Sequence, residues 1–337
     1  MVAYLTTHNS FNSGNEGFLL PNQTYSISQQ LNDGVRALMI DVYNYNNVPT
    51  VYHGYSYLGT APLISNLNEI KEFLDENPNE VITIIFEAYT TATAIASVFE
   101  EAGLLPYVYT KPVYGAWPTL QQLIDSGKRL IVFSDENDAI PGMEWYHYVW
   151  HHAVETHYSV SNINNFTCDY NRGNPDNDLF IFNHFVTGML GNGSLATAEQ
   201  VNANPFFINR AIGCWESNQK FPNFITVDFY EAGQCLEVVN TLNSLHTVNF
   251  TQQSRNSNIS VFYCIDAKTI DILIPENIES PAKITVYSIT GQLVYSKKLH
   301  VVGESLSLPI GSMNSGAYFI SLTDNAGNER TARFMAY

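Results

Sequence analysis

The sequence predicts an α/β protein: a TIM-type (β/α)8 barrel, followed by a small all-β sandwich domain. Up to about residue 250, short apolar segments typical of buried parallel strands alternate with amphipathic segments typical of helices. A polar stretch follows, and after it come short β-branched runs separated by turn residues. We therefore expect a barrel over residues 1–250, a linker over 251–264 and a sandwich over 265–337.

Seven apolar segments of the first part predict barrel strands, since strands buried on both faces are short and rich in apolar residues. They are residues 3–7, 35–42, 50–53, 81–86, 129–133, 179–183 and 223–229. An eighth strand is expected within the aromatic stretch 145–150, and eight strands favour a closed barrel over an open sheet.

Four amphipathic segments between these strands predict helices, at residues 26–32, 63–76, 93–102 and 120–125. Barrel enzymes carry their catalytic groups at the carboxyl ends of the strands. Five ionisable residues close or directly follow predicted strands, and we expect them at this face: His8, Asp41, His53, Glu87 and Asp228.

The last part of the chain contains five further strand candidates. They are residues 270–274, 283–288, 293–299, 317–322 and 330–335. Turn residues at 290–291, 314–316 and 325–328 separate some of them, which is typical of a small antiparallel sandwich.

The charge of the chain narrows the possible partners. Before residue 251 there are eight Lys and Arg against 25 Asp and Glu, whereas the rest of the chain is balanced. Nucleic-acid binding depends on Lys and Arg contacts to phosphates, so we expect no nucleic-acid partner. No segment has the length of a membrane-spanning helix, and the start lacks the regions of a signal peptide. Because a strand is expected almost at once, we expect that a natural precursor began earlier.

The four cysteines show no C-x-x-C spacing, which argues against a zinc site. They are Cys168, Cys214, Cys235 and Cys264. Their even number permits disulfides, and isolated buried thiols are the alternative. The sequence does not choose a pairing.

Four motifs of the first part contain or flank these ionisable residues: Thr7-His8-Asn9-Ser10, the run GVRALMID at 34–41, Tyr52-His53-Gly54-Tyr55 and Ile84-Ile85-Phe86-Glu87. Together they resemble the X domain of phosphatidylinositol-specific phospholipases C. The resemblance implies cleavage of a phosphatidylinositol-type lipid. The inositol 2-hydroxyl would attack phosphorus, releasing diacylglycerol and a cyclic inositol phosphate.

The same resemblance implies that His8 is the general base and His53 the general acid. Imidazole suits both roles because it titrates near neutral pH. A base histidine normally needs an acceptor on its second ring nitrogen. Asp228 lies on the last predicted strand, next to the first in a closed barrel, and is our candidate for this role; a structural aspartate is the alternative.

Three further residues match the metal ligands of the calcium-dependent members of this family: Asn9, Asp41 and Glu87. Metal-independent members place an arginine where Asp41 stands. The resemblance therefore implies a calcium site, and oxygen ligands of this kind suit that ion. Met39 stands where calcium enzymes have a carboxylate, so we expect a site that fills mainly with substrate or uses another divalent metal.

Other candidates carry less weight. Alternation along its strand places Arg36 on the face opposite Asp41, where an ion pair outside the barrel is favoured. His184 is expected at the barrel mouth, without a catalytic role. Four histidines lie among aromatic residues, where packing or a substrate-facing loop is favoured over a metal site: His147, His151, His152 and His157.

The last 70 or so residues resemble the C-terminal sorting domain of type IX secretion in Bacteroidota. The matching stretches are ITVYSITG at 284–291 and GAYFI at 316–320. This implies a protein that is secreted or held at the cell surface, with the type IX secretion machinery as a partner. A carbohydrate-binding accessory module is the alternative.

The sequence thus favours a secreted, monomeric, calcium-assisted phospholipase C acting on a membrane phospholipid or a soluble phosphodiester. Two alternatives stay open. The same barrel could cleave another glycerophosphodiester or a lysophospholipid. It could also be a non-catalytic module that binds a lipid headgroup or a glycan at the barrel mouth.

Overall fold

The computed structural model describes eleven segments of the chain. They are residues 1–111, 115–136, 140–188, 190–251, 259–264, 268–273, 280–289, 291–300, 305–311, 313–314 and 316–336. The chain divides into two compact units, Met1–His246 and Thr247–Tyr337, and each is considered by itself. Across the described segments, no helix has both the length and the apolar character needed to cross a membrane.

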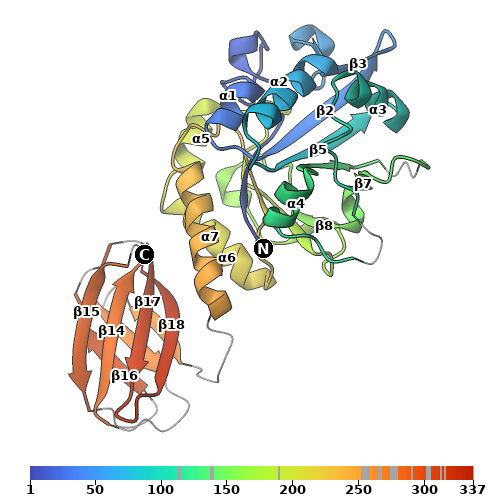
Figure 1. Ribbon diagram of the computed structural model, residues 1–337. Helices are drawn as coiled ribbons and strands as arrows, with labels where there is room; N and C mark the ends of the chain where they lie inside the picture. The colour runs from blue at the N-terminus through green and yellow to red at the C-terminus, as the bar shows by residue number, and fades with distance from the viewer. Residues whose placement is uncertain are drawn as a thin grey trace. The chain divides into compact units, whose positions relative to one another are not determined.

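Eight parallel strands form the barrel sheet of the first unit. They are β1 (Tyr4–Thr7), β2 (Ala37–Tyr45), β5 (Ile82–Tyr89), β6 (Leu130–Ser134), β7 (Tyr146–Tyr148), β8 (Ala153–Thr156), β10 (Leu179–Asn183) and β11 (Phe224–Val227). Their order is β7-β6-β5-β2-β1-β11-β10-β8, so β1 lies between the next strand and the last one. The predicted TIM-type barrel is confirmed (Figure 1). The hydrogen-bonded order of these eight parallel strands runs from β7 to β8.

One predicted barrel strand is wrong, and one was missed. Residues 50–53 were expected in the barrel, but β3 (Val48–Val51) runs antiparallel to β2 and pairs with β4 (Ala61–Pro62). Asn46 and Asn47 both have positive φ, 53° and 64°, which is the conformation of a tight hairpin turn. The strand that completes the eight is β8, and β9 (Tyr170–Gly173) adds to it antiparallel.

Seven helices accompany the strands of the first unit in the described segments. They are α1 (Ile27–Asn32), α2 (Leu63–Glu76), α3 (Ala92–Glu101), α4 (Leu120–Ser126), α5 (Leu195–Val201), α6 (Phe206–Asn218) and α7 (Cys235–Thr251). The first four match the predicted segments closely, whereas the last three were not predicted. Short 3-10 helices lie at η1 (Gly14–Glu16), η2 (Ser56–Leu58), η3 (Val149–His151) and η4 (Ile163–Asn165).

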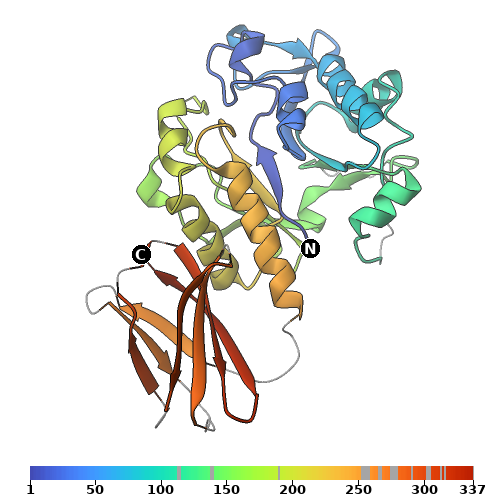
Figure 2. The ribbon, with the colours of Figure 1, turned by 60° about the vertical axis from the view of Figure 1, so that its left-hand side comes forward.

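The helices lie on the outer side of the curled sheet (Figure 2). Helix α7 is tied to the start of β1, because the Asn243 amide exchanges hydrogen bonds of 2.7 and 2.9 Å with the backbone of Ala3. Inside the barrel, side chains from successive strands pack into one buried cluster that includes Ala37, Ile85, Phe133, Ile181 and Phe224. Burying each large apolar side chain contributes roughly 1.5–3 kcal/mol.

The second unit is the predicted sandwich. One sheet contains β12 (Ser260–Cys264), β13 (Thr269–Leu273) and β16 (Ser305–Pro309); the other contains β14 (Ala282–Ser288), β15 (Leu293–Leu299), β17 (Gly316–Thr323) and β18 (Glu329–Ala336). All pairs are antiparallel, and Ile270, Ile284 and Ile320 belong to one shared core.

The predicted linker is only partly a linker. Strand β12 lies inside residues 251–264, and α7 continues to Thr251. Both β12, with the sequence SVFYC, and β16, with the sequence SLSLP, were missed because each is only five residues long. Of the predicted strand and turn positions, residue 274, residue 290 and residue 315 lie outside the described residues.

Candidate active site

The register of β1 and β11 brings His8 and Asp228 together. Thr7 pairs with Val227, and His8 and Asp228 are the next residues on the two strands. The His8 Nδ1 atom lies 2.9 Å from Asp228 Oδ1. This agrees with the expectation that the first and last strands of the barrel are neighbours. Burial raises the pKa of Asp228, which is 4% exposed, although His8 and Asn22 act in the opposite direction. This carboxylate is therefore held against the ring nitrogen of His8.

Two buried amides that the sequence analysis missed fix this pair. Asn22 Nδ2 donates to Asp228 Oδ1 over 3.1 Å, and Gln23 Nε2 donates to the His8 carbonyl oxygen over 2.8 Å. The Phe185 ring stacks on the imidazole of His8, with ring centroids 3.9 Å apart. No motif in the sequence points to these residues, because they lie in loops. Together they leave His8 one orientation in which its Nδ1 faces Asp228.

His53 reaches the same region by way of the hairpin rather than a barrel strand. A Cβ atom added to Gly191, which has φ +80°, would lie only 2.2 Å from His53 Cε1, so the ring lies directly against this loop. The Gly191 carbonyl oxygen in turn accepts a 3.4 Å hydrogen bond from Asn22, a neighbour of His8. Burial and then His8 lower the pKa of His53 to about 4, while Glu87 opposes this. In the free protein His53 is therefore neutral at neutral pH.

Four carboxylates line a single pocket together with His8, from Asp41, Glu87, Asp135 and Glu155. Asp41 and Glu87 are register partners on β2 and β5. Asp135 directly follows Ser134, which pairs with Phe86, so it lies beside Glu87. The sequence analysis missed Asp135, although it lies close behind the predicted strand at residues 129–133, as Glu87 does behind the strand at 81–86.

These carboxylates differ in how they are satisfied. Tyr89 Oη donates to Glu87 Oε1, and the Ala88 N–H donates to Asp135 Oδ1 over 2.9 Å. Asp41 is 6% exposed and receives no hydrogen bond from a described residue. Burial, followed by Glu87 and Asp135, raises the pKa of Asp41 well above its usual range. Burial also raises the pKa of Asp135 to about 6. A bound cation would stabilise the ionised forms of these carboxyl groups and offset the repulsion between them.

The donor chemistry of this pocket fits a hard divalent cation, while the arrangement is not yet a closed site. Calcium binds carboxylate and amide oxygens. Asn9 and Asp135 line the pocket together with Asp41 and Glu87. In the described part of the chain, however, no three His, Cys, Asp or Glu side chains are grouped as a metal site. Met39, which also lines the pocket, supplies no such oxygen. Side chains such as Glu87, now bound by Tyr89, would have to turn toward an ion.

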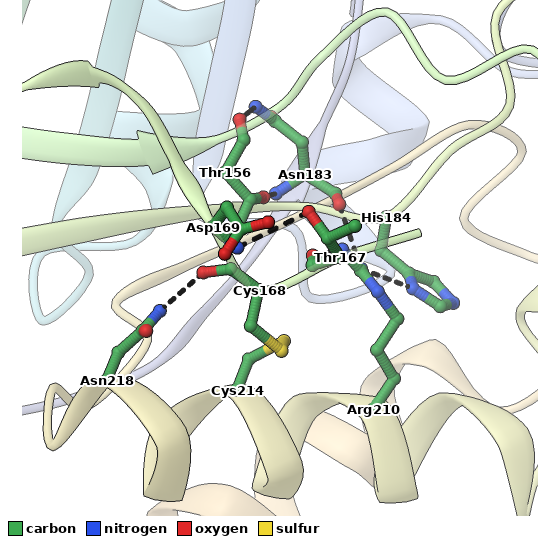
Figure 3. The surroundings of a disulfide bond; sticks show 9 residues. All are labelled: Thr156, Thr167, Cys168, Asp169, Asn183, His184, Arg210, Cys214 and Asn218. Carbon is green, nitrogen blue, oxygen red and sulfur yellow. Dashed lines mark hydrogen bonds between the residues drawn. A yellow bond between two sulfur atoms is a disulfide. The ribbon is translucent and has the colours of Figure 1, made fainter. Parts of the chain in front are cut away.

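His184 was expected to line the barrel mouth without a catalytic role, but the structure buries this residue completely. Its ring stacks on Phe207 with centroids 4.0 Å apart, and Arg210 Nη1 lies 2.9 Å from His184 Nδ1 (Figure 3). Burial, followed by the Arg210 charge, lowers the pKa of His184 well below its usual range. The neutral imidazole thus accepts from arginine inside the protein core.

The open question of cysteine pairing is answered in part. Cys168 and Cys214 form a disulfide that joins the segment before β9 to α6 (Figure 3). Cys235 is a buried free thiol. The side chain of Cys264 lies outside the described part of the chain.

Arg36 and the aromatic histidines play the structural parts that were favoured. Arg36 Nε lies 2.7 Å from Glu80 Oε2, away from the pocket. His147 Nε2 donates a hydrogen bond to the Tyr109 carbonyl oxygen, 3.1 Å away. Its ring packs edge-on against Trp117. His147 lies in β7 and His151 in η3, so the two residues do not lie one turn apart on an α-helix.

Comparison with known families agrees with both resemblances. The family model PI-PLC X 1 matches residues 1–243, and the model of a secretion system C-terminal sorting domain matches residues 266–335.

The curated relatives are plant and fungal proteins. The PI-PLC X domain-containing protein At5g67130 of Arabidopsis thaliana is 29% identical over 272 residues, covering 71% of this chain and 61% of the relative. The PI-PLC X domain-containing protein 1 of Arthroderma benhamiae is 28% identical over 264 residues, covering 72% and 85%. The chain thus spans less than two thirds of the plant relative.

A solved structure shares the barrel fold. A phosphatidylinositol-specific phospholipase C from Staphylococcus aureus, carrying pentafluoro-phenylalanine, superposes with a TM-score of 0.50 at 13% identity, over 71% of this chain and 91% of that one. At this identity the likeness concerns the fold alone.

Proposed function

This chain belongs to the PI-PLC X-domain family, and on that premise we propose that its barrel cleaves phosphatidylinositol-type lipids to diacylglycerol and cyclic inositol phosphate. The fold and the family support a phosphodiesterase. The observation that carries the finer proposal is the buried His8–Asp228 pair, which lies near His53 at the carboxyl ends of the strands. The sorting domain at residues 266–335 marks the protein for secretion.

The geometry suits His8 as the general base. With the His8 Nδ1–H donated to Asp228, Nε2 carries the free lone pair that can take the proton of the inositol 2-hydroxyl. The 2-oxygen then bonds to phosphorus, and the bond from phosphorus to the diacylglycerol oxygen breaks. Asp228 stabilises the imidazolium that forms, because its carboxylate faces the protonated nitrogen.

His53 returns a proton to the leaving diacylglycerol oxygen in this proposal. For that it must be protonated when substrate is bound, whereas its pKa of about 4 leaves it neutral in the free protein. A bound phosphodiester is an anion, and a nearby negative charge raises the pKa of an imidazole. Bound substrate therefore favours the protonated form of His53, which is the form that donates the proton.

We further propose calcium as the cofactor, or another divalent metal, held by Asn9, Asp41 and Glu87. Asp135 provides the carboxylate that Met39 does not. Two features support this: Asp41 is buried without a hydrogen-bond partner among the described residues, and burial, followed by its carboxylate neighbours, raises its pKa. Calcium would neutralise the phosphoryl oxygens and lower the charge of the pocket.

Product analysis with phosphatidylinositol vesicles tests the proposal. His8→Ala and His53→Ala should each lower the rate of cyclic inositol phosphate formation by on the order of 10³-fold, since each removes one proton transfer. His157→Ala is the matched control, because its exposed side chain accepts from the Ser159 N–H and does not line the pocket. An undiminished rate in either pocket variant would overturn the assignment.

The attacking group has its own test. Phosphatidylinositol with a methylated 2-hydroxyl should not be cleaved, since no oxygen is then free to bond to phosphorus. Cleavage of this analogue would instead favour direct hydrolysis, as for another glycerophosphodiester or a lysophospholipid. Binding without turnover of any such lipid, across pH and divalent ions, would favour a non-catalytic binding module.

A further inference from the structure

The pocket that contains His8 is strongly acidic. Four carboxylates line it, from Asp41, Glu87, Asp135 and Glu155. Arg172 is the one Lys or Arg among the described residues that line it. A phosphodiester anion entering this pocket therefore meets a single fixed positive charge of the protein.

Arg172 is held rigidly by its neighbours. It lies opposite Glu155 in the β8–β9 pair, and its Nε donates to Glu155 Oε1 over 2.5 Å. The guanidinium carbon lies 4.4 Å from the centre of the Trp150 ring and 4.5 Å from that of Tyr158. Glu155 is itself fixed, because Asn183 Nδ2 donates to its Oε2 over 3.0 Å. Rotation of the guanidinium is thus restricted on three sides.

The ion pair with Glu155 leaves the other edge of the guanidinium open. Only Nε is engaged, and neither Nη atom hydrogen-bonds to a described residue. The side chain keeps 38% of its surface exposed, against 3% for Glu155. Arg172 lines the same pocket as Asp135 and Asp41. The open edge thus belongs to the pocket that contains the three candidate metal ligands and His8.

The hairpin that carries Arg172 is anchored from outside the barrel. The Cys168–Cys214 disulfide joins the segment before β9 to α6, and Asn218 Nδ2 donates to the Cys168 carbonyl oxygen over 2.7 Å (Figure 3). Arg210 Nη2 also donates to the Thr167 carbonyl oxygen, over 3.0 Å. These bonds fix the start of β9, two residues before Arg172.

We propose that Arg172 binds the phosphate group of the substrate through its two Nη atoms. A planar guanidinium donates two parallel hydrogen bonds to a pair of phosphate oxygens, which a lone ammonium cannot do. The proposal rests on the proposed phosphodiester chemistry of the pocket and adds to it a residue outside the motifs of the family resemblance. Arg172 is a binding residue, and no proton transfer is assigned to it.

Calorimetric titration separates this role from catalysis. The probes are inorganic phosphate, myo-inositol 1-phosphate and myo-inositol, each with calcium and with EDTA. Arg172→Met should weaken binding of both phosphate-containing probes by about 10- to 100-fold, the usual worth of a charge-assisted hydrogen-bond pair. Arg172→Lys should recover part of this loss, because it restores the charge without the fork. Lys128→Met removes an exposed positive charge outside the pocket and should leave the affinities unchanged.

The outcomes distinguish this inference from the proposed function. Equal phosphate affinity in Arg172→Met and the wild type overturns the inference, as does a wild type that binds no phosphate. A loss confined to myo-inositol would also overturn it, since Arg172 would then contact hydroxyl groups. If phosphate binding depends on Arg172 but no inositol lipid is cleaved, the inference stands and the proposed function fails. Circular dichroism of each variant checks that its fold is intact.

Discussion

The two sides of the pocket are built in different ways. On one side, Asp228 receives hydrogen bonds from both His8 and Asn22, and the position of each is fixed by its neighbours. On the other side, Asp41 and Glu87 lie in register, and Asp41 has no hydrogen-bond partner among the described residues. The first side is complete as it stands, whereas the second holds neighbouring carboxyl groups whose ionised forms a bound cation would stabilise. This contrast suggests that proton transfer is preorganised and that charge neutralisation arrives with the metal and the substrate.

Replacing Asp228 tests the completed side and should have the largest effect. Asp228→Asn keeps the size of the side chain but cannot stabilise an imidazolium or hold the required tautomer of His8. We expect kcat to fall by on the order of 10³-fold with little change in KM. The measurement is steady-state cleavage of phosphatidylinositol. Asp125→Asn, an exposed carboxylate on α4, is the control, and equal loss in both variants would contradict the role.

Replacing Asp135 tests the incomplete side. If Asp135 takes the place of the carboxylate absent at Met39, Asp135→Asn should raise the calcium Kd by about tenfold, because one charged ligand is lost. Calorimetry and the calcium-dependent rise in melting temperature both report this without an activity assay. Glu136→Gln, the exposed neighbour, is the matched control.

The requirement for a metal ion can be tested directly on the wild-type protein. Excess EDTA should abolish lipid cleavage by the wild-type protein. Full activity in EDTA, or calcium affinity unchanged by Asp135→Asn and by Asp41→Asn, would remove the metal from the proposal. The first side of the pocket would then act with Arg172 alone as its fixed cation.

How much of this pocket the sequence predicts depends on how each residue is placed. His8, Asp41, Glu87 and Asp228 sit at strand ends, so strand order and periodicity predict their neighbourhood. Asp135 carried the same signal and was overlooked. The position of His53 was predicted through a wrong element, since Asn-Asn at 46–47 turns the chain into a hairpin.

Other residues could not be predicted from local pattern. Asn22 and Gln23 act from a loop whose path is fixed only by tertiary contacts. Arg172 lies at the pocket because β9 pairs antiparallel with β8. Strand β8 was not predicted, because it is only four residues long and directly follows an aromatic stretch of the sequence. The Cys168–Cys214 pairing likewise depends on where α6 packs, which residue spacing does not encode.

The protonation of His53 links the two sides of the pocket. Burial and His8 lower its pKa to about 4, so the free protein should show His53 titrating far below an ordinary histidine. Bound inorganic phosphate adds negative charge and should raise this pKa by about one unit or more. Imidazole signals in heteronuclear NMR, assigned with His53→Ala, measure both values. A His53 pKa near 6.5 in the free protein, or one that phosphate does not change, would contradict the proposal that bound substrate favours protonation of His53.

The disulfide should have the smallest effect on turnover, because it anchors the Arg172 hairpin without lining the pocket. Removing it in Cys168→Ala/Cys214→Ala frees the start of β9, while Glu155, Trp150 and Tyr158 still hold the guanidinium. We expect KM to rise by about two- to fivefold with kcat unchanged, and stability to fall by about 2–4 kcal/mol. Kinetics and thermal melting measure these changes, and reduction of the wild-type protein should reproduce them. A fall in kcat comparable to that of Asp228→Asn would mean that the anchored hairpin takes part in proton transfer, and the division between the two sides of the pocket would fail.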